Sequence, residues 1–279
     1  MKKQRYKINE DYPIEHSTLI VCWNQDVGYI GQGISEYINA ELHAYHLGQI
    51  EPDGFYAMDS VAVDNNLAQF PENRFTYYPQ GNLVIFTGTH PDRQWYDFLS
   101  TILDVAQKHC AASQIYTTGG MISVTGHITP RELITVANSA EMSYDLAQYD
   151  PVTRAIEYYE TPPGRRPTTN AYLLWMTQRR NLDAGCLWIP VPFYLAPGDD
   201  PQAVRRILDF LALKINLKID FGRINDEISE QNEKIARLRE KDMEIDNAIS
   251  ALESNLSISG NESQKLINAI QETLKKSDE

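Results

Sequence analysis

Cysteine is scarce in this sequence of 279 residues, which contains only Cys22, Cys110 and Cys186. No two of them form a C-x-x-C pair, and each lies in a run typical of an apolar strand or helix. An odd number of such cysteines is typical of reduced, buried thiols in a reducing compartment. We therefore expect no disulfide framework.

Long hydrophobic runs are absent as well. No stretch approaches the roughly 20 apolar residues that a membrane-spanning helix needs. The polar start of the chain, residues 1–6, lacks the apolar core of a signal peptide. These two absences predict a cytoplasmic protein without a membrane segment.

Basic residues are also few, with 25 Lys and Arg against 38 Asp and Glu, so the formal net charge is −13. An acidic protein is repelled at long range by phosphate backbones and by anionic membranes. The composition therefore predicts a protein that binds neither nucleic acid nor membranes.

The stretch from residue 18 to residue 45 predicts the fold class. Residues 18–23 form an apolar run of strand length that is rich in β-branched side chains. After a loop with glycines, apolar residues recur every fourth position, as on one face of a helix: Ile30, Ile34, Ile38 and Leu42. A strand that is apolar throughout and is followed by a helix is typical of a sheet covered on both faces. The predicted class is therefore α/β.

Further strands and helices alternate, which predicts a three-layer α/β/α domain with a mostly parallel mixed sheet. The strands are predicted at 47–50, 55–58, 60–63, 74–79, 83–88, 115–121 and 186–191. Helices are predicted over 95–110, after a capping box at 129–132, after a cap at Asn170, and over 201–215. Residues 1–16 are predicted to be a polar lead-in, and 17–221 the α/β domain.

From Gly222 the apolar pattern changes to a repeat of seven residues, which predicts a coiled coil. Apolar residues occupy two positions of the repeat. The first, interrupted only by Asp242, contains Phe221, Ile228, Ile235, Ile249 and Leu256. The second, interrupted only by Gln231, contains Ile224, Leu238, Ile245 and Leu252. We expect Gly260 to end this helix as a left-handed cap, and 261–276 to form a second one. Residues 222–279 are thus predicted to be a helical hairpin, which could contact a protein partner or clasp its own domain.

Three glycines, Gly28, Gly31 and Gly33, lie between the first strand and its helix, where backbone N–H groups can hold an anion. The pattern is not the dinucleotide fingerprint, because Glu36 occupies the third glycine position counted from Gly31. It is not a Walker loop either, since no Lys-Ser/Thr follows. We favour a tight turn and close helix–sheet packing over phosphate binding.

Five residues are candidates for a ligand crevice at the strand ends: Gly28, Gly31, His90, Gly119 and Gly120. His90 follows a central strand, where α/β proteins commonly place ligands, and Asp92 could orient it as a base. No Ser or Cys can be paired with it by sequence. We favour the alternative, in which Asp92 caps a helix beside a solvated His90. Turn geometry alone also explains the two glycines at 119 and 120.

Two further groups of residues are weaker candidates for a functional site. His43 and His46 could ligate a metal from one helix face, but no third ligand is spaced to join them. Arg165 and Arg166, in a Pro-rich loop at 161–167, could contact an acidic partner or a carboxylate, or could simply be solvated. The sequence therefore predicts no metal, no cofactor and no catalytic residue.

Several of these segments together resemble the proteasome assembly chaperone two family. The resemblance rests on residues 19–23, 27–31, 83–88, 118–120, 188–195 and 203–220, in this order. It implies a domain like that of nucleoside phosphorylases, self-association to a homo-oligomer and, as in eukaryotic members, non-enzymatic chaperoning of proteasome α subunits. Residues 276–279 depart from the hydrophobic-Tyr-X tail by which some archaeal relatives dock on proteasome rings.

Hypotheses of different classes follow. The first is a non-enzymatic, self-associating scaffold or assembly-chaperone-like protein, with the C-terminal helices as its contact with a partner. The second is a phosphorylase- or hydrolase-type enzyme that acts on a small molecule in the crevice. A third is a chaperone that acts on a proteasome-like ring despite the altered tail.

Overall fold

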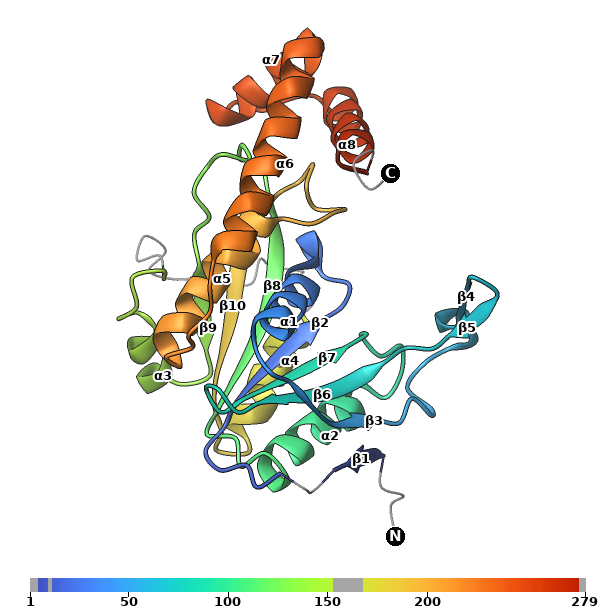
Figure 1. Ribbon diagram of the computed structural model, residues 1–279, viewed down its shortest axis with the longest axis vertical. Helices are drawn as coiled ribbons and strands as arrows, with labels where there is room; N and C mark the ends of the chain where they lie inside the picture. Colours follow the sequence, from blue (N-terminus) through green and yellow to red (C-terminus); the bar gives the residue numbers. More distant parts are fainter. Residues whose placement is uncertain (1–4, 10–11, 153–167, 276–279) are drawn as a thin grey trace.

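The computed structural model describes residues 5–9, 12–152 and 168–275. In these ranges the chain forms an eight-stranded sheet of order β1-β3-β6-β7-β2-β8-β10-β9 (Figure 1). Its strands are β1 (Tyr6–Ile8), β2 (Thr18–Trp23), β3 (Tyr45–Ile50), β6 (Asn73–Tyr78), β7 (Leu83–Gly88), β8 (Gln114–Ser123), β9 (Ile134–Ala137) and β10 (Asp183–Pro192).

The centre of this sheet is parallel and its two flanks are antiparallel. β2 pairs in parallel with β7 and with β8, and β8 pairs in parallel with β10. β6, β3 and β1 continue the sheet antiparallel on one side, and β9 does so on the other. The predicted α/β class with a mixed sheet is confirmed, and its parallel part is confined to the four central strands.

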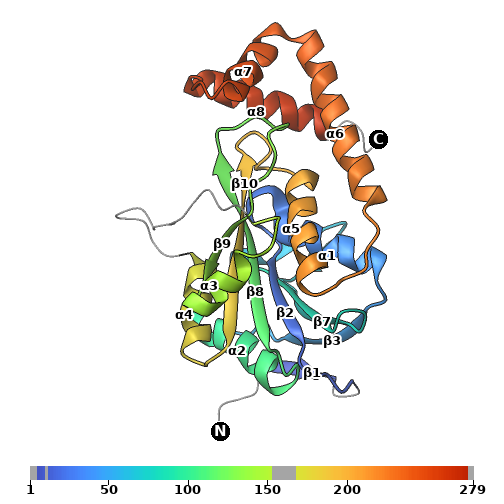
Figure 2. The same cartoon turned by 90° about the vertical axis from the view of Figure 1, so that its left-hand side faces the viewer.

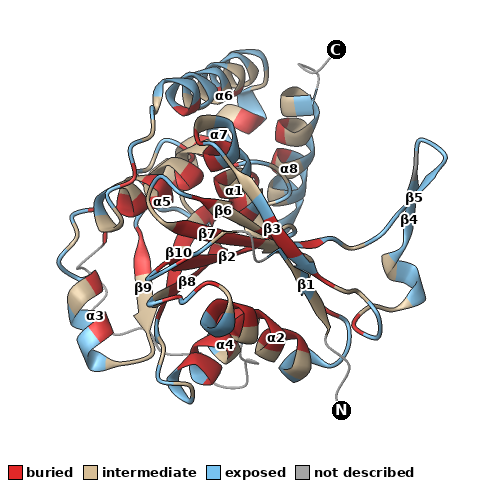
Figure 3. Cartoon of the chain, turned by 60° about the horizontal axis from the view of Figure 1, so that its bottom comes forward, coloured by how far each residue is buried: buried red, intermediate tan, exposed pale blue. Residues whose placement is uncertain are grey.

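Helices cover both faces of the sheet and make it the middle of three layers (Figure 2). One face carries α1 (Ile30–Glu41) and α5 (Pro201–Lys214), the other carries α2 (Trp95–Lys108) and α4 (Thr169–Gln178), and α3 (Ala140–Leu146) lies beside β9. All six residues of β2 are buried, because Ile20 and Cys22 face α1 while Trp23 faces α2 and α4. Figure 3 shows the same division, with buried strands between helices whose outer faces are exposed.

Two predicted elements are wrong. Residues 129–132 do not begin a helix, because Arg131 turns inward to an ion pair with Asp200 and the next residues form β9 against the edge of β10. Residues 55–58 lie in a turn and at the start of a 3-10 helix (Met58–Ser60) rather than in a strand. Within the polar lead-in, β1 pairs with β3, since Tyr6 and Ile8 pack against the core.

Three helices follow the sheet domain: α6 (Gly222–Lys241), α7 (Met243–Glu253) and α8 (Gly260–Lys275). The heptads predict one helix up to residue 256, but the helix breaks at Asp242, whose carboxylate caps α7 by accepting from two backbone N–H groups. Asn255, with φ 56°, takes the left-handed position predicted for Gly260. Gly260 instead begins α8.

The apolar seam of these helices is buried within the chain itself. Its residues share one hydrophobic cluster with α1, α5 and the loop after β10: Ile235, Ile245, Ile249, Leu252, Leu266 and Ile270. Arg239 of α6 adds ion pairs to Asp246 (2.8 Å) and Glu253 (2.7 Å) of α7. The heptads leave two roles open, contact with a protein partner or a clasp on the chain's own domain. The packing within this chain corresponds to the clasp.

A narrow hairpin, residues 57–72, projects away from the body between β3 and β6, and we call it the arm (Figure 1). Its strands are β4 (Ala62–Asp64) and β5 (Leu67–Gln69). Asn65 and Asn66 join them with φ values of 48° and 63°. Two successive left-handed residues give the tight turn whose twist matches that of a hairpin, so the arm has a defined shape.

Candidate functional site

A pocket of about 720 Å³ lies at the carboxyl ends of the parallel strands, where open α/β sheets commonly bind ligands. Aromatic rings dominate its lining: Trp23, His90, Trp95, Tyr172 and Trp188. The other lining residues are Gln25, Asp26, Val27, Thr118, Gly119, Gly120, Thr168, Thr169 and Asn170.

Asn170 holds the start of α4 against the floor of this pocket. Its Oδ1 accepts hydrogen bonds from Trp23 Nε1 (2.7 Å) and Thr117 Oγ1 (2.6 Å). Its Nδ2 donates to the carbonyl oxygen of Thr118 (2.9 Å). The prediction that Asn170 caps α4 is wrong, because Thr168 provides the capping oxygen and Asn170 lies inside the helix, buried.

His90 lies between two tryptophans. Its ring centroid is 4.2 Å from that of Trp23 and 6.2 Å from that of Trp95, with interplanar angles of 22° and 27°. Burial lowers the pKa of His90 to about 4, so the imidazole is neutral at pH 7.

Asp92 does not orient His90, contrary to one sequence hypothesis. Its carboxylate accepts from the backbone N–H of Ala57 (2.8 Å) and from the Ser60 hydroxyl, and so holds the base of the arm. The favoured alternative is also wrong in part, because His90 is half-buried rather than solvated and Asp92 does not cap α2.

Asp26 brings a carboxyl group to the pocket edge. Desolvation raises the pKa of Asp26 to about 7, although its two oxygens accept from the Gly31 N–H at 3.3 and 3.2 Å. The same side chain therefore lines the pocket and satisfies the start of α1. A carboxyl group with a pKa near 7 can hold or release a proton beside a bound molecule.

Three of the five predicted crevice residues lie together, because His90, Gly119 and Gly120 all line the pocket. Gly31 lies behind it, where an added Cβ would be 2.6 Å from the backbone N and O of Trp23. Gly28, with φ 74°, lines a separate polar groove between α1 and α6. The glycine loop therefore allows a tight turn and close helix–sheet packing, the interpretation that the sequence favours. A ligand role for the other three residues stays a prediction.

The remaining candidates lie elsewhere. His43 and His46 do not share a helix face, because α1 ends at Glu41 and His46 lies in β3. No three His, Cys, Asp or Glu side chains gather as metal ligands within residues 5–9, 12–152 and 168–275. Arg165 and Arg166 fall outside the described residues.

The three cysteines are buried and unpaired, as predicted. Cys22 faces α1, away from the pocket, and desolvation raises the pKa of its thiol well above the ordinary range. A thiol that stays protonated on the opposite face of the sheet cannot act as a nucleophile in the pocket.

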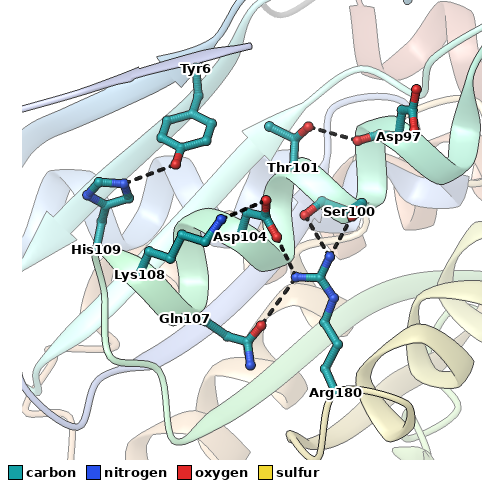
Figure 4. Close-up of polar contacts among 9 residues, drawn as sticks. All are labelled: Tyr6, Asp97, Ser100, Thr101, Asp104, Gln107, Lys108, His109 and Arg180. Atoms are coloured by element: carbon teal, nitrogen blue, oxygen red, sulfur yellow. Dashed lines mark hydrogen bonds and ion pairs between the residues drawn. The ribbon is translucent and has the colours of Figure 1, made fainter. Parts of the chain in front are cut away.

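A polar network fastens together the two helices that wall the pocket (Figure 4). Arg180, just after α4, donates to Asp104 Oδ1 (2.7 Å), to Gln107 Oε1 (3.2 Å) and to the oxygen atoms of Ser100, all on α2. Lys108 adds a 3.0 Å ion pair to the same Asp104 carboxylate. This network holds the end of α4 against α2, at the opposite end of α4 from the residues that line the pocket.

Sequence reasoning missed the residues that shape this pocket. Trp23 ends an apolar strand, and a large aromatic ring at that position is a usable signal for a lined cavity, whereas Trp188 lies in the middle of β10 and gives no such signal. Asn170 and Asp26 carried no such signal, because their roles depend on partners that are distant in the sequence or on burial.

Fold and site together define a class: an α/β/α protein with an aromatic pocket at the strand ends and a C-terminal helical clasp. The chain belongs to the PAC2 family, whose profile matches residues 23–239. The family resemblance noted from the sequence is thereby confirmed. No curated protein matches the sequence significantly, and no helix in the described ranges is long and apolar enough to cross a membrane.

Solved structures share this fold. A Mycobacterium tuberculosis protein of unknown function, Rv2714, has a TM-score of 0.76 at 16% identity, over 91% of each chain. A proteasome-assembly chaperone homologue from the same organism, Rv2125, has a TM-score of 0.70 at 16% identity, over 83% of this chain and 99% of its own. PbaB, an archaeal proteasome activator from Pyrococcus furiosus, has a TM-score of 0.66 at 17% identity, over 85% of this chain and 99% of its own.

Proposed function

We propose that the protein is a non-enzymatic, self-associating scaffold of the assembly-chaperone type. The observation that carries the proposal is the arm, on which Met58, Val63 and Phe70 are exposed. β4 and β5 pack chiefly on each other among the described elements. A two-stranded hairpin is only marginally stable alone, and an apolar surface of this kind marks a protein contact.

The chemistry of the pocket supports binding rather than catalysis. His90 is neutral and held between two tryptophans, and Asp26 is engaged with the start of α1. Among the described residues, the pocket lining contains no Ser or Cys that either group could activate. A cavity with aromatic walls is suited to hold an apolar group without transforming it.

The names of two structural neighbours give the proposal its direction, since one is a proteasome-assembly chaperone homologue and the other a proteasome activator. We propose that this chain likewise acts by binding other proteins. Because the first of these names refers to assembly, we propose that the bound proteins are unassembled subunits.

Two measurements test this function. Light scattering of the full chain over a range of concentrations should give a mass that is a multiple of the 31.8 kDa monomer. A monomer at every concentration contradicts self-association. Native mass spectrometry with proteasome α-type subunits of the same organism should show a complex with free subunits. Its absence contradicts the chaperone part of the proposal.

The volume of the aromatic pocket favours a second candidate, a phosphorylase- or hydrolase-type enzyme that acts on a small molecule. A thermal-shift screen with nucleosides, phosphate and small peptides separates the two functions. A ligand response that is lost in His90→Ala favours the enzyme. No response across the panel favours the scaffold.

A further inference from the structure

The two faces of the arm differ in polarity, as its strand register shows. Val63 lies opposite Ala68, and Ala62 lies opposite Gln69. Because side chains alternate along a strand and opposite residues share a face, Val63 and Ala68 are on one face and Ala62, Leu67 and Gln69 are on the other. Val61 and Phe70, one residue beyond the pairing, follow the alternation of the Val63 face. We call Val61, Val63, Ala68 and Phe70 the apolar face of the arm.

This apolar face is uncovered in the single chain. Val63 is 75% exposed and Phe70 is 62% exposed. Over residues 57–72 the sequence has three acidic residues, Asp59, Asp64 and Glu72, and no Lys, Arg or His. In the register of the arm Asp64 lies opposite Leu67, on the other face, and Glu72 pairs with Arg74. The surface that covers the apolar face should therefore be mainly apolar or aromatic, with positive charge only at its edge, toward the acidic residues of the arm.

The same chain offers such a surface on α2 and α4, which lie side by side on one face of the molecule (Figure 3). Trp95 and Tyr96 of α2 and Trp175 of α4 are exposed. The guanidinium of Arg179 lies 5.1 Å above the Trp175 ring. Residues 169–180 contain no acid, and since Arg180 is engaged with Asp104, Arg179 is the arginine left to meet a partner here. Surfaces rich in aromatic residues and Arg are typical of protein interfaces.

The base of the arm is anchored close to the start of α2, where this aromatic surface begins. Asp92, which anchors the base of the arm, lies between His90 and Trp95 in the sequence, and both of these line the pocket. Within one chain the arm points away from the body (Figure 1). Each copy therefore presents an uncovered apolar face on an acidic arm and an uncovered aromatic surface beside Arg179, and it does not join the two to each other.

We propose that the apolar face of the arm packs on the Trp95–Trp175 surface of a second copy. The contact uses different patches on the two copies, so it is head to tail and closes into a ring or continues as a chain of copies. The proposal rests on the self-association proposed above and names the surfaces that produce it.

Substitutions on the two faces of the arm test it. Val63→Asp and Phe70→Asp place a carboxylate on the apolar face, and Leu67→Asp is the matched control because Leu67 is 65% exposed on the other face. In light scattering of the full chain we expect each apolar-face variant to raise the dissociation constant ~30-fold or more, as at an interface hot spot. Leu67→Asp should associate as the wild type does.

A mixing experiment tests the head-to-tail geometry. Trp175→Asp should weaken association as much as the apolar-face variants do, because it disrupts the receiving surface and leaves the arm intact. An equimolar mixture of Trp175→Asp and Val63→Asp retains one working interface and should form a dimer with one copy of each variant and nothing larger. Circular dichroism of each variant checks that the fold is kept.

The outcomes separate this inference from the proposed function. If the wild type associates and the apolar-face variants associate equally well, the arm is not the interface and only this inference fails. Dissociation by Leu67→Asp to the same extent also overturns it, as does a mixture that stays monomeric. A wild type that is monomeric throughout overturns both proposals.

Discussion

Trp23 and Asn170 are 147 residues apart in the sequence, and the indole Nε1 of one donates to the amide Oδ1 of the other at 2.7 Å. This hydrogen bond joins the end of β2 to the first turn of α4 at the floor of the aromatic pocket. Both side chains are buried. Losing this hydrogen bond would leave buried polar groups with neither a protein partner nor water, which costs free energy. The bond therefore helps to hold the floor of the pocket in place.

Asn170→Ala should lower the free energy of unfolding by about 3 kcal/mol, because it leaves the Trp23 N–H, the Thr117 hydroxyl and the Thr118 carbonyl without their partner. Urea unfolding monitored by circular dichroism measures the change. Thr169→Ala, at the adjacent position in the same turn, is the control and should change stability by less than about 0.5 kcal/mol. Equal losses in the two variants would show that the network is not the cause.

Asp26 should make stability fall as pH rises. Burial raises its folded-state pKa to about 7 from 3.8, so the folded protein holds this proton more tightly than the unfolded chain does. The resulting stabilisation is complete below about pH 4 and is lost as pH rises through about 7, amounting to at most about 4 kcal/mol. Asp26→Asn keeps an oxygen for the start of α1 and should abolish this dependence.

Urea midpoints of the wild type and Asp26→Asn between pH 4 and pH 8 check this prediction. His90 and His127, whose pKa values burial lowers to about 4, give stability that is present above about pH 6.5 and is lost as pH falls toward 4. Both proteins contain these histidines, so their contribution cancels in the difference. A difference that does not vary with pH would contradict the assignment to Asp26.

Local patterns in the sequence predict the layers of this fold better than its site. The apolar run at 18–23 predicts a buried central strand, because burial on both faces requires every side chain to be apolar. The capping-box pattern at 129–132 fails because Arg131 is drawn to Asp200, a partner 69 residues away. The heptads predict the C-terminal helices, yet the break at Asp242 depends on a side chain that caps the next helix.

The site depends on long-range pairings that no local pattern contains. Gly119 and Gly120 lie in the middle of β8, which runs on to Ser123, rather than at a strand end, and they do line the pocket. The stacking of His90 between Trp23 and Trp95 depends on the register of β2 against β7. Local sequence patterns do not predict that register. The polarity of the arm likewise becomes visible only when Val63 is known to face Ala68.

Gly31→Ala should be strongly destabilising, by about 3 kcal/mol or more, because the new Cβ would lie 2.6 Å from the backbone N and O of Trp23. Those atoms belong to a central strand and cannot move aside. Gly260→Ala is the matched control, since a Cβ there meets nothing within 4 Å at the start of α8. It should leave stability unchanged or raise it by up to about 1 kcal/mol. Thermal unfolding of both variants measures these changes in stability. A small loss of stability in Gly31→Ala would mean that α1 packs less closely on β2 than in the structure.

The clasp makes a prediction that separates stability from association. Ile270 of α8 is fully buried in the hydrophobic cluster that the three C-terminal helices share with the sheet domain, so Ile270→Ala should lower the free energy of unfolding by about 3 kcal/mol. Leu256, which is exposed between α7 and α8, should tolerate alanine within about 0.5 kcal/mol. Because the Ile270 side chain is covered by its own chain, the mass measured by light scattering under folding conditions should not change in Ile270→Ala. A dissociated but equally stable Ile270→Ala would instead place the heptad seam between copies, and the clasp would then be an interface.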